Sequence, residues 1–165
     1  EKLSEICQMP IQLAVLGSGE ASIEEKMAQL EAGNRGKIAF YKGYNDSLAH
    51  RIYAACDMFL MPSLFEPCGI SQLISMRYGT LPLVRETGGL KDTVTPYNEF
   101  DKTGNGFSFT NYNSDEMIQV MYNAISVYYD RPEDWKTLVR NAMDTDVSWD
   151  HSADTYCQLY SQLHL

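Results

Sequence analysis

Four short apolar segments recur along the first half of the chain, separated by segments in which apolar residues lie at helical spacing. The apolar segments, which we expect to form buried strands, are residues 11–16, 37–41, 58–61 and 81–84. Between them we expect helices that begin at Ser22, at Asp46 or Ser47, and at Ile70. Repeated strand–helix units predict an α/β, Rossmann-like fold, with a parallel sheet covered by helices on both faces.

Polar residues and glycines predict where these helices begin and end. Ser22 and Glu25 have the spacing of a capping box, in which both side chains satisfy free backbone N–H groups. Gly33 and Gly79 are expected to end the first and third helices, because glycine readily adopts the left-handed conformation that closes a helix.

The second half of the chain begins with a polar segment and ends with helices. Residues 91–113 are rich in Thr, Asn, Gly and Asp and are expected to be loop-like, apart from a short strand at 107–109. Three helices are expected after it, from Ser114 to about Tyr129, from Pro132 to about Met143, and from Ser148 or Asp150 to about Leu163.

Composition and charge restrict the function. The 165 residues suffice for one domain, residues 1–165, and contain no apolar run near the roughly 20 residues of a membrane span. The net charge of −9 argues against a nucleic-acid partner, because a phosphate backbone would be repelled. Four scattered cysteines form no Cys-x-x-Cys pair, which favours neither a metal site nor a disulfide framework and makes a reducing cytoplasm the default compartment.

Four glycine-containing loops follow the first four expected strands. They are Gly17–Glu20, Lys42–Asn45, Pro62–Gly69 and Arg85–Gly89. Ligands of open parallel sheets bind outside the C-terminal ends of the strands. We therefore expect these loops to form the ligand site.

Glu66 lies in the third of these loops, just before the helix expected from Ile70. A carboxylate there can hold hydroxyl groups, and the free N–H groups of the helix N-terminus beside it can hold an anion. From the spacing alone, a solvated loop carboxylate explains Glu66 equally well. Thr87-Gly88-Gly89 in the fourth loop favours close approach of the backbone to a ligand, although a turn with positive φ would also explain the glycines.

Gly17-Ser18-Gly19 suggests a phosphate-binding turn, but a dinucleotide fingerprint would place a third glycine where Ser22 stands. The acidic residue expected after the second strand is also missing, since Tyr41 and Lys42 stand there, which argues against an NAD site. A plain strand-to-helix turn explains this motif by itself. Tyr44 has the character of a stacking residue for a flat base, although an exposed loop tyrosine is the commoner case.

Together these segments resemble the C-terminal half of bacterial glycogen synthases and plant starch synthases. The resemblance covers nearly the whole chain in order, and its most specific motifs are Glu66-Pro-Cys-Gly69, followed by Gln72, and Thr87-Gly-Gly-Leu90. Further matching segments are Gly43-Tyr44, His50-Arg51-Ile52, Pro62-Ser63, Tyr78-Gly-Thr80, Pro82-Leu-Val-Arg85, Asp92-Thr93-Val94, Gly106-Phe107 and Ser148-Trp149.

The resemblance implies a GT-B glycosyltransferase with two Rossmann-like domains, of which residues 1–165 would be the donor-binding one. Enzymes of this family transfer glucose from ADP-glucose to the 4-hydroxyl at the non-reducing end of an α-1,4-glucan, with retention, and they need no metal or cofactor. The acceptor domain, and the arginine and lysine that bind phosphate, would precede residue 1. We therefore expect this chain alone to be inactive, and to expose a strand edge or groove where the remainder docks.

By matching motifs, the resemblance also implies roles for individual residues. Glu66 would stand near the glucose and its developing positive charge, and Tyr44 would pack on adenine. Backbone N–H groups of residues 68–70 would hold sugar hydroxyls, and Ser71 would face the phosphates. With Glu66 as the catalytic candidate, the donor-binding set is Gly17, Tyr44, Cys68, Gly69, Ile70, Ser71, Thr87, Gly88 and Gly89.

Two alternatives stay open. One is a related GT-B transferase that uses another nucleotide sugar, since a preference for adenine over uracil does not follow from the residues. The other is a non-catalytic module that binds nucleotide or glucan without transfer.

Overall fold

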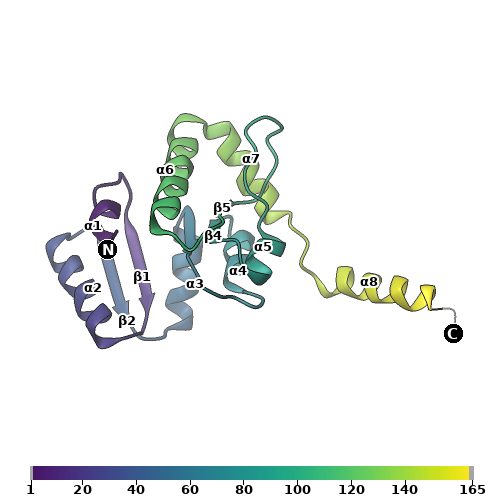
Figure 1. The fold of residues 1–165 in the computed structure, drawn as a ribbon, viewed down its shortest axis with the longest axis horizontal. Coiled ribbons are helices and arrows are strands. Elements are labelled where there is room, and N and C mark those ends of the chain that lie inside the picture. The colour runs from purple at the N-terminus through teal and green to yellow at the C-terminus, as the bar shows by residue number, and fades with distance from the viewer. Residues whose placement is uncertain (1, 164–165) are drawn as a thin grey trace.

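The structure of the protein is a computed structural model that describes residues 2–163 (Figure 1). Its strands are β1 (Leu13–Gly17), β2 (Ile38–Lys42), β3 (Met58–Met61), β4 (Leu81–Arg85) and β5 (Phe107–Phe109). Its helices are α1 (Leu3–Ile6), α2 (Ala21–Gly33), α3 (Asp46–Ala55), α4 (Ser71–Arg77), α5 (Gly88–Thr93), α6 (Ser114–Asp130), α7 (Pro132–Met143) and α8 (Trp149–Gln162). All five expected strands are present, and β3 and β5 have the predicted bounds.

The strands form two parallel sheets, where the sequence predicted one. β1 pairs with β2, and β3, β4 and β5 form a second sheet in that order. All the pairs are parallel, with Leu13 opposite Ile38 and Met58 opposite Leu81. The α/β class is confirmed, but the single continuous sheet is wrong for residues 2–163, because β1 and β3 do not pair with each other.

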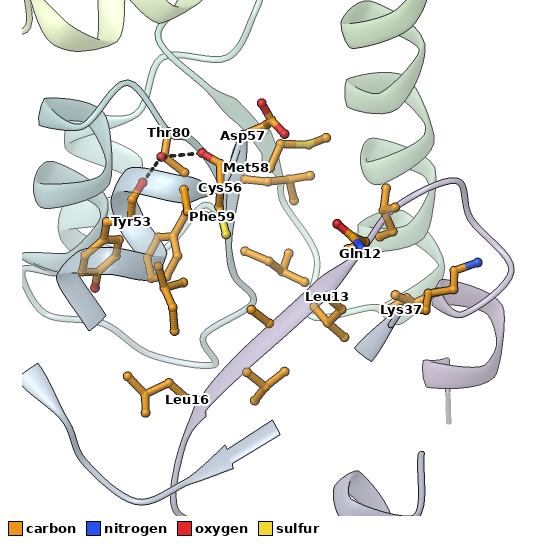
Figure 2. A pocket seen from close by; sticks show the side chains of 18 of the residues that line it. Gln12, Leu13, Leu16, Lys37, Tyr53, Cys56, Asp57, Met58, Phe59 and Thr80 are labelled. Carbon is orange, nitrogen blue, oxygen red and sulfur yellow. Dashed lines mark hydrogen bonds between the residues drawn. The ribbon is translucent and has the colours of Figure 1, made fainter. Parts of the chain in front are cut away.

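An apolar groove separates the open edges of β1 and β3. Its volume is about 1360 Å³. Figure 2 shows Leu13 and Leu16 beside β1, with Met58 and Phe59 near β3. Helix α6 adds Ile125 to the lining. The groove exceeds the range of about 300–1,000 Å³ usual for small-molecule pockets, and apolar side chains dominate its walls.

Backbone groups on both edges of the groove have no strand partner. The N–H of Leu13 donates to the carbonyl of Lys37 on the β2 side. Because successive residues of a strand direct their N–H groups to opposite sides, Ala14 and Leu16 present theirs to the groove. The carbonyl of Asp57 accepts from Leu81 on the β4 side, so Met58 and Leu60 face the groove in the same way.

The hydrophobic core lies around β4 and β5. Residues 81–84 of β4 are all buried, and α4, α6 and α7 pack against this sheet. Phe107 of β5 stacks on Trp135 of α7, with ring centroids 6.1 Å apart. Leu138 of α7 is also fully buried. This core fixes the C-terminal ends of β3 and β4, from which the site loops leave.

Three of the predicted helix caps are wrong by one or two residues. Helix α2 begins at Ala21, so Ser22 lies inside it and forms no capping box. Asn45, and not Asp46 or Ser47, caps α3, because it has the extended backbone that a cap requires and accepts the N–H of Leu48 at 2.9 Å. Asn113 likewise caps α6 one residue before Ser114, whereas Ser148 caps α8 as predicted.

Two short helices differ from the elements expected along the chain. Helix α5 begins at Gly88 and covers residues 91–93, which were expected to be loop. Its two leading glycines have low helix propensity and conceal it in the sequence. Helix α1 is a single turn whose Ile6 is buried in the main core.

Helix α8 extends away from the rest of the molecule (Figure 1). None of its residues is buried, and Trp149 is 87% exposed. Within residues 2–163, no helix has the length and apolar character needed to cross a membrane. The same range contains no cluster of His, Cys, Asp and Glu side chains suited to hold a metal ion.

Candidate functional site

The loop after β3 lies directly against the first turn of α5. The N–H of Gly89 donates to the carbonyl of Pro67 at 3.2 Å. A Cβ on Gly88 would overlap the carbonyl oxygen of Glu66, and one on Gly89 would overlap that of Cys68. Gly88 also has a φ of +45°, a left-handed conformation that favours glycine. The glycine pair therefore allows contact between two backbones, and the positive φ expected as an alternative explanation of the glycines is present at Gly88.

Helix α4 begins at Ser71 with its first-turn N–H groups uncapped by any side chain. Ile70 precedes it and is exposed, and Gly69 before that is buried with a φ of +69°. Ser71 is half-buried. Free N–H groups at a helix N-terminus attract negative charge, so this end of α4 is suited to an anion.

Glu66 is half-buried in the loop between β3 and α4. Among residues 2–163, no side chain forms an ion pair or hydrogen bond with its carboxylate. The loop around it is held by backbone contacts, so the carboxylate has a fixed base and an unengaged charge. It can therefore act on a positively charged or hydroxyl-bearing ligand.

Arg85 at the end of β4 holds the beginning of the same loop, a role that was not expected from the sequence. Its guanidinium donates to the carbonyls of Ser63 at 2.8 Å and Leu64 at 2.5 Å. The group also lies over the ring of Tyr112, 5.7 Å from its centroid. The sequence did contain a signal for this role. A cation at the end of a buried strand lies close to the loop that follows the neighbouring strand and can bind its carbonyl groups.

Gln72 of α4 is a second residue that the sequence reading left without a role. Its side chain is fully buried, and its amide donates toward the loop at Cys68 and Gly69 and toward Thr93 of α5. A long polar side chain on the inner face of a helix was the signal for it.

Gly17 and Tyr44 belong to the other sheet. Gly17 ends β1, and its carbonyl accepts the N–H of Gly43 at 2.9 Å. Tyr44 is 86% exposed, and its hydroxyl lies 3.3 Å from a carboxylate oxygen of Asp46, whose negative charge raises the pKa of Tyr44. Both residues line the groove, and so does Ser71. Residues 66–69 and 87–89 are thus brought together directly, whereas Gly17 and Tyr44 are related to them only across the groove.

Both cations at the strand ends are already engaged by protein acceptors. Lys42 at the end of β2 lies 2.7 Å from Glu24, and this hydrogen bond lowers the pKa of Glu24. Arg85 donates to the carbonyls described above. An anionic ligand here would therefore meet mainly backbone N–H groups from residues 2–163.

Comparison with known proteins identifies the family of the chain. Residues 1–141 match the family model described as glycosyl transferases group 1. Glycogen synthases from Clostridium beijerinckii and Geobacillus thermodenitrificans are 51% and 52% identical to the chain, and each match covers 96% of this chain and 33% of the relative. The chain thus spans about a third of the length of these curated relatives.

Two solved structures of related enzymes have a fold similar to that of the chain. The catalytic domain of starch synthase IV from Arabidopsis thaliana, bound to ADP and acarbose, matches with a TM-score of 0.78 at 28% identity, over 94% of this chain and 39% of that chain. Sucrose-phosphate synthase from Thermosynechococcus elongatus matches with a TM-score of 0.67 at 22% identity, over 98% of this chain and 41% of that chain. The family model covers most of the chain, and the chain therefore belongs to the group 1 glycosyl transferases.

Proposed function

We propose that residues 1–165 form the donor-binding part of a bacterial glycogen synthase. The reaction is transfer of glucose from ADP-glucose to the non-reducing end of an α-1,4-glucan, with retention at the anomeric carbon. Identity of 51–52% to two bacterial glycogen synthases supports it. The observation that carries it is the packed pair of loops, one of which contains Glu66 and leads directly into the uncapped N-terminus of α4.

In the proposed donor site, different residues bind the sugar, the diphosphate and the adenine of ADP-glucose. Backbone N–H groups of residues 68–70 bind the sugar hydroxyls, and Ser71 with the first turn of α4 binds the diphosphate. Tyr44 stacks on the adenine, with Gly17 nearby at the end of β1. Gly17, Tyr44 and Ser71 all line the groove, which supports a ligand that reaches from one sheet to the other. Residues 87–89 form the wall behind residues 66–69.

The chemistry of the step fits this division. The leaving group is a diphosphate whose negative charge grows as the glycosidic bond breaks, and free N–H groups of α4 stabilise it. The sugar ring develops positive charge in the same transition state, and the Glu66 carboxylate offsets it. We propose no metal or cofactor for this reaction.

The remaining parts of the enzyme are proposed to lie outside residues 1–165. These parts comprise the acceptor domain and the cations that compensate the diphosphate, since Lys42 and Arg85 are engaged elsewhere. Polypeptide from the same protein would also pair with the open edges of β1 and β3, which leaves the donor site at the C-terminal ends of the strands. The matched glycogen synthases have about two thirds of their length beyond the matched segment, which supports this division. The chain alone is therefore inactive, and four free cysteines are compatible with a cytoplasmic enzyme.

A second candidate is a transferase of the same fold that uses another nucleotide sugar. The Anabaena protein HepE, solved with UDP-glucose, matches with a TM-score of 0.65 at 22% identity, which is a likeness of fold alone. The third candidate is a non-catalytic module that binds nucleotide or glucan.

Donor selection by the full-length protein separates these candidates. Glycogen elongation is measured with radiolabelled ADP-glucose and with UDP-glucose at equal concentrations. The proposal expects incorporation from ADP-glucose at least about 10-fold faster. Faster incorporation from UDP-glucose would favour the second candidate, and none from either donor would favour the third.

A further inference from the structure

Gln72 is buried in a way that packing alone does not require. Its side chain has no exposed surface, although it ends in an amide. The amide nitrogen lies 3.0 Å from the carbonyl oxygen of Gly69, 3.3 Å from that of Cys68 and 3.1 Å from the hydroxyl of Thr93. The opposite orientation would bring the amide oxygen against two carbonyls, so these contacts fix which end faces the loop.

The hydroxyl of Thr93 extends these contacts to the first turn of α5. It donates to the carbonyl of Gly89 at 2.6 Å, so its lone pair is the partner of the Gln72 amide. A continuous chain of hydrogen bonds thus runs from Gln72 through Thr93 to Gly89. Its ends are Cys68 and Gly69 in the loop before α4 and Gly89 in the first turn of α5.

The contacts of Gln72 carry an energetic cost. Its amide oxygen is buried and has no hydrogen-bond partner within residues 2–163. A buried acceptor without a partner loses its hydration and regains nothing, which offsets part of what the three contacts of the amide nitrogen contribute to stability. All three contacts of the amide nitrogen are to the two segments that form the proposed site, which points to control of the positions of these segments.

We propose that Gln72 is a positioning residue, which acts through Thr93 to hold the Glu66–Gly69 loop in register with Gly88 and Gly89. This inference rests on the proposed function of these loops and adds a residue to it. In that register the N–H groups at Gly69 and Ile70 have fixed directions before the donor binds. N–H groups that are held in place in advance stabilise the transition state more than the ground state. Loss of the Gln72 and Thr93 hydrogen bonds should therefore lower kcat more than it weakens the binding of ADP-glucose.

The test uses the full-length enzyme with Gln72→Met, Thr93→Val and Thr93→Ser. Gln72→Met and Thr93→Val are expected to lower kcat at least about 10-fold, with the KM for ADP-glucose changed less than about 3-fold. Their melting temperatures should stay within a few degrees of the wild type. Thr93→Ser keeps the hydroxyl and should restore most of the turnover. Thr93→Val also serves if Gln72→Met fails to fold.

Thr137→Val is a matched control. The Thr137 hydroxyl also donates to the carbonyl four residues before it, that of Glu133 at 3.0 Å. Thr137 lies within α7, and its hydroxyl contacts neither loop. This variant should keep wild-type kcat. Wild-type kcat in both Gln72→Met and Thr93→Val would overturn the proposal.

A readout that needs no donor separates this inference from the proposed function. Hydrogen exchange at the Gly89 amide, which is bonded to Pro67, should be at least about 10-fold faster in Gln72→Met than in Thr137→Val. An unchanged exchange rate of the Gly89 amide in Gln72→Met would overturn the positioning role of Gln72. Absence of transfer from ADP-glucose by the wild type would overturn the proposed function alone.

Discussion

The N–H of Gly89 donates to the carbonyl oxygen of Pro67 at 3.2 Å, so two loops that leave adjacent strands meet backbone to backbone. This contact leaves no room for a side chain, since a Cβ at Gly89 would overlap the carbonyl of Cys68. The proposed donor site thus depends on two glycines for its shape, before any ligand is present.

Gly89→Ala is expected to force these loops apart. The atoms that obstruct the new Cβ are backbone atoms of Cys68, so no side-chain rotation can make room for it. We expect the free energy of unfolding to fall by about 1–3 kcal/mol, the usual cost of overpacking, and transfer activity of the full-length enzyme to be lost. Urea unfolding measures the first effect.

Gly33→Ala is the matched control for this substitution. Gly33 ends α2, and a Cβ there would have no atom within 4 Å. Alanine should leave stability unchanged or raise it slightly. An equal loss in both variants would argue against the contact between the loops as the cause.

The groove predicts a specific pattern of amide exchange. The N–H groups of Ala14 and Leu16 face the groove and have no strand partner, whereas that of Val15 faces β2. In the isolated chain, Ala14 and Leu16 should exchange at least about 10-fold faster than Val15. In the full-length protein all three should be protected. Equal exchange in the two proteins would show that no polypeptide pairs with this open edge of β1.

The sequence predicted single elements well and their assembly less well. The runs at 58–61 and 107–109 became β3 and β5 with the expected bounds, because turn residues flank each short apolar run. The separation of β1 from β3 was not predictable in this way, since apolar periodicity identifies a strand but not its neighbour. Strand pairing depends on contacts between residues far apart in the sequence.

The site shows the same limit. The spacing placed Glu66 and residues 87–89 at strand ends, and the structure brings their loops together. The contact partner of each glycine was not readable, because a glycine indicates that a side chain is excluded but not which atom excludes it. The hydrogen bonds of Gln72 to Thr93, 21 residues later, were hidden for the same reason.

Asp134 predicts a dependence of stability on pH. The Lys102 ammonium, 2.7 Å away, holds the pKa of Asp134 below its usual range, and the Tyr97 hydroxyl also donates to it. Because the pKa is lowered in the folded state, the stabilisation is present above the unfolded value of about 3.9 and disappears as pH falls through the folded value. Asp134→Asn should therefore destabilise the protein at pH 7 and have little effect near pH 2.

Urea unfolding at both pH values measures this difference. Glu133→Gln is the control, since Glu133 forms an exposed pair with Lys136 of the same helix at 2.7 Å. It should change stability little at pH 7. A loss for Asp134→Asn that is the same at both pH values would contradict the ion pair as its cause.

The most direct test of the account is the turnover of Glu66→Ala in the full-length enzyme with ADP-glucose and glycogen. Glu66 has no side-chain partner among residues 2–163, so its loss should leave folding intact while it removes the charge that opposes the developing cation. Glu25→Ala, on the exposed face of α2, serves as control. The account predicts a fall in kcat of about 10²-fold or more for Glu66→Ala alone. Turnover within about 3-fold of the wild type would contradict a catalytic role for Glu66 and the donor site built around it.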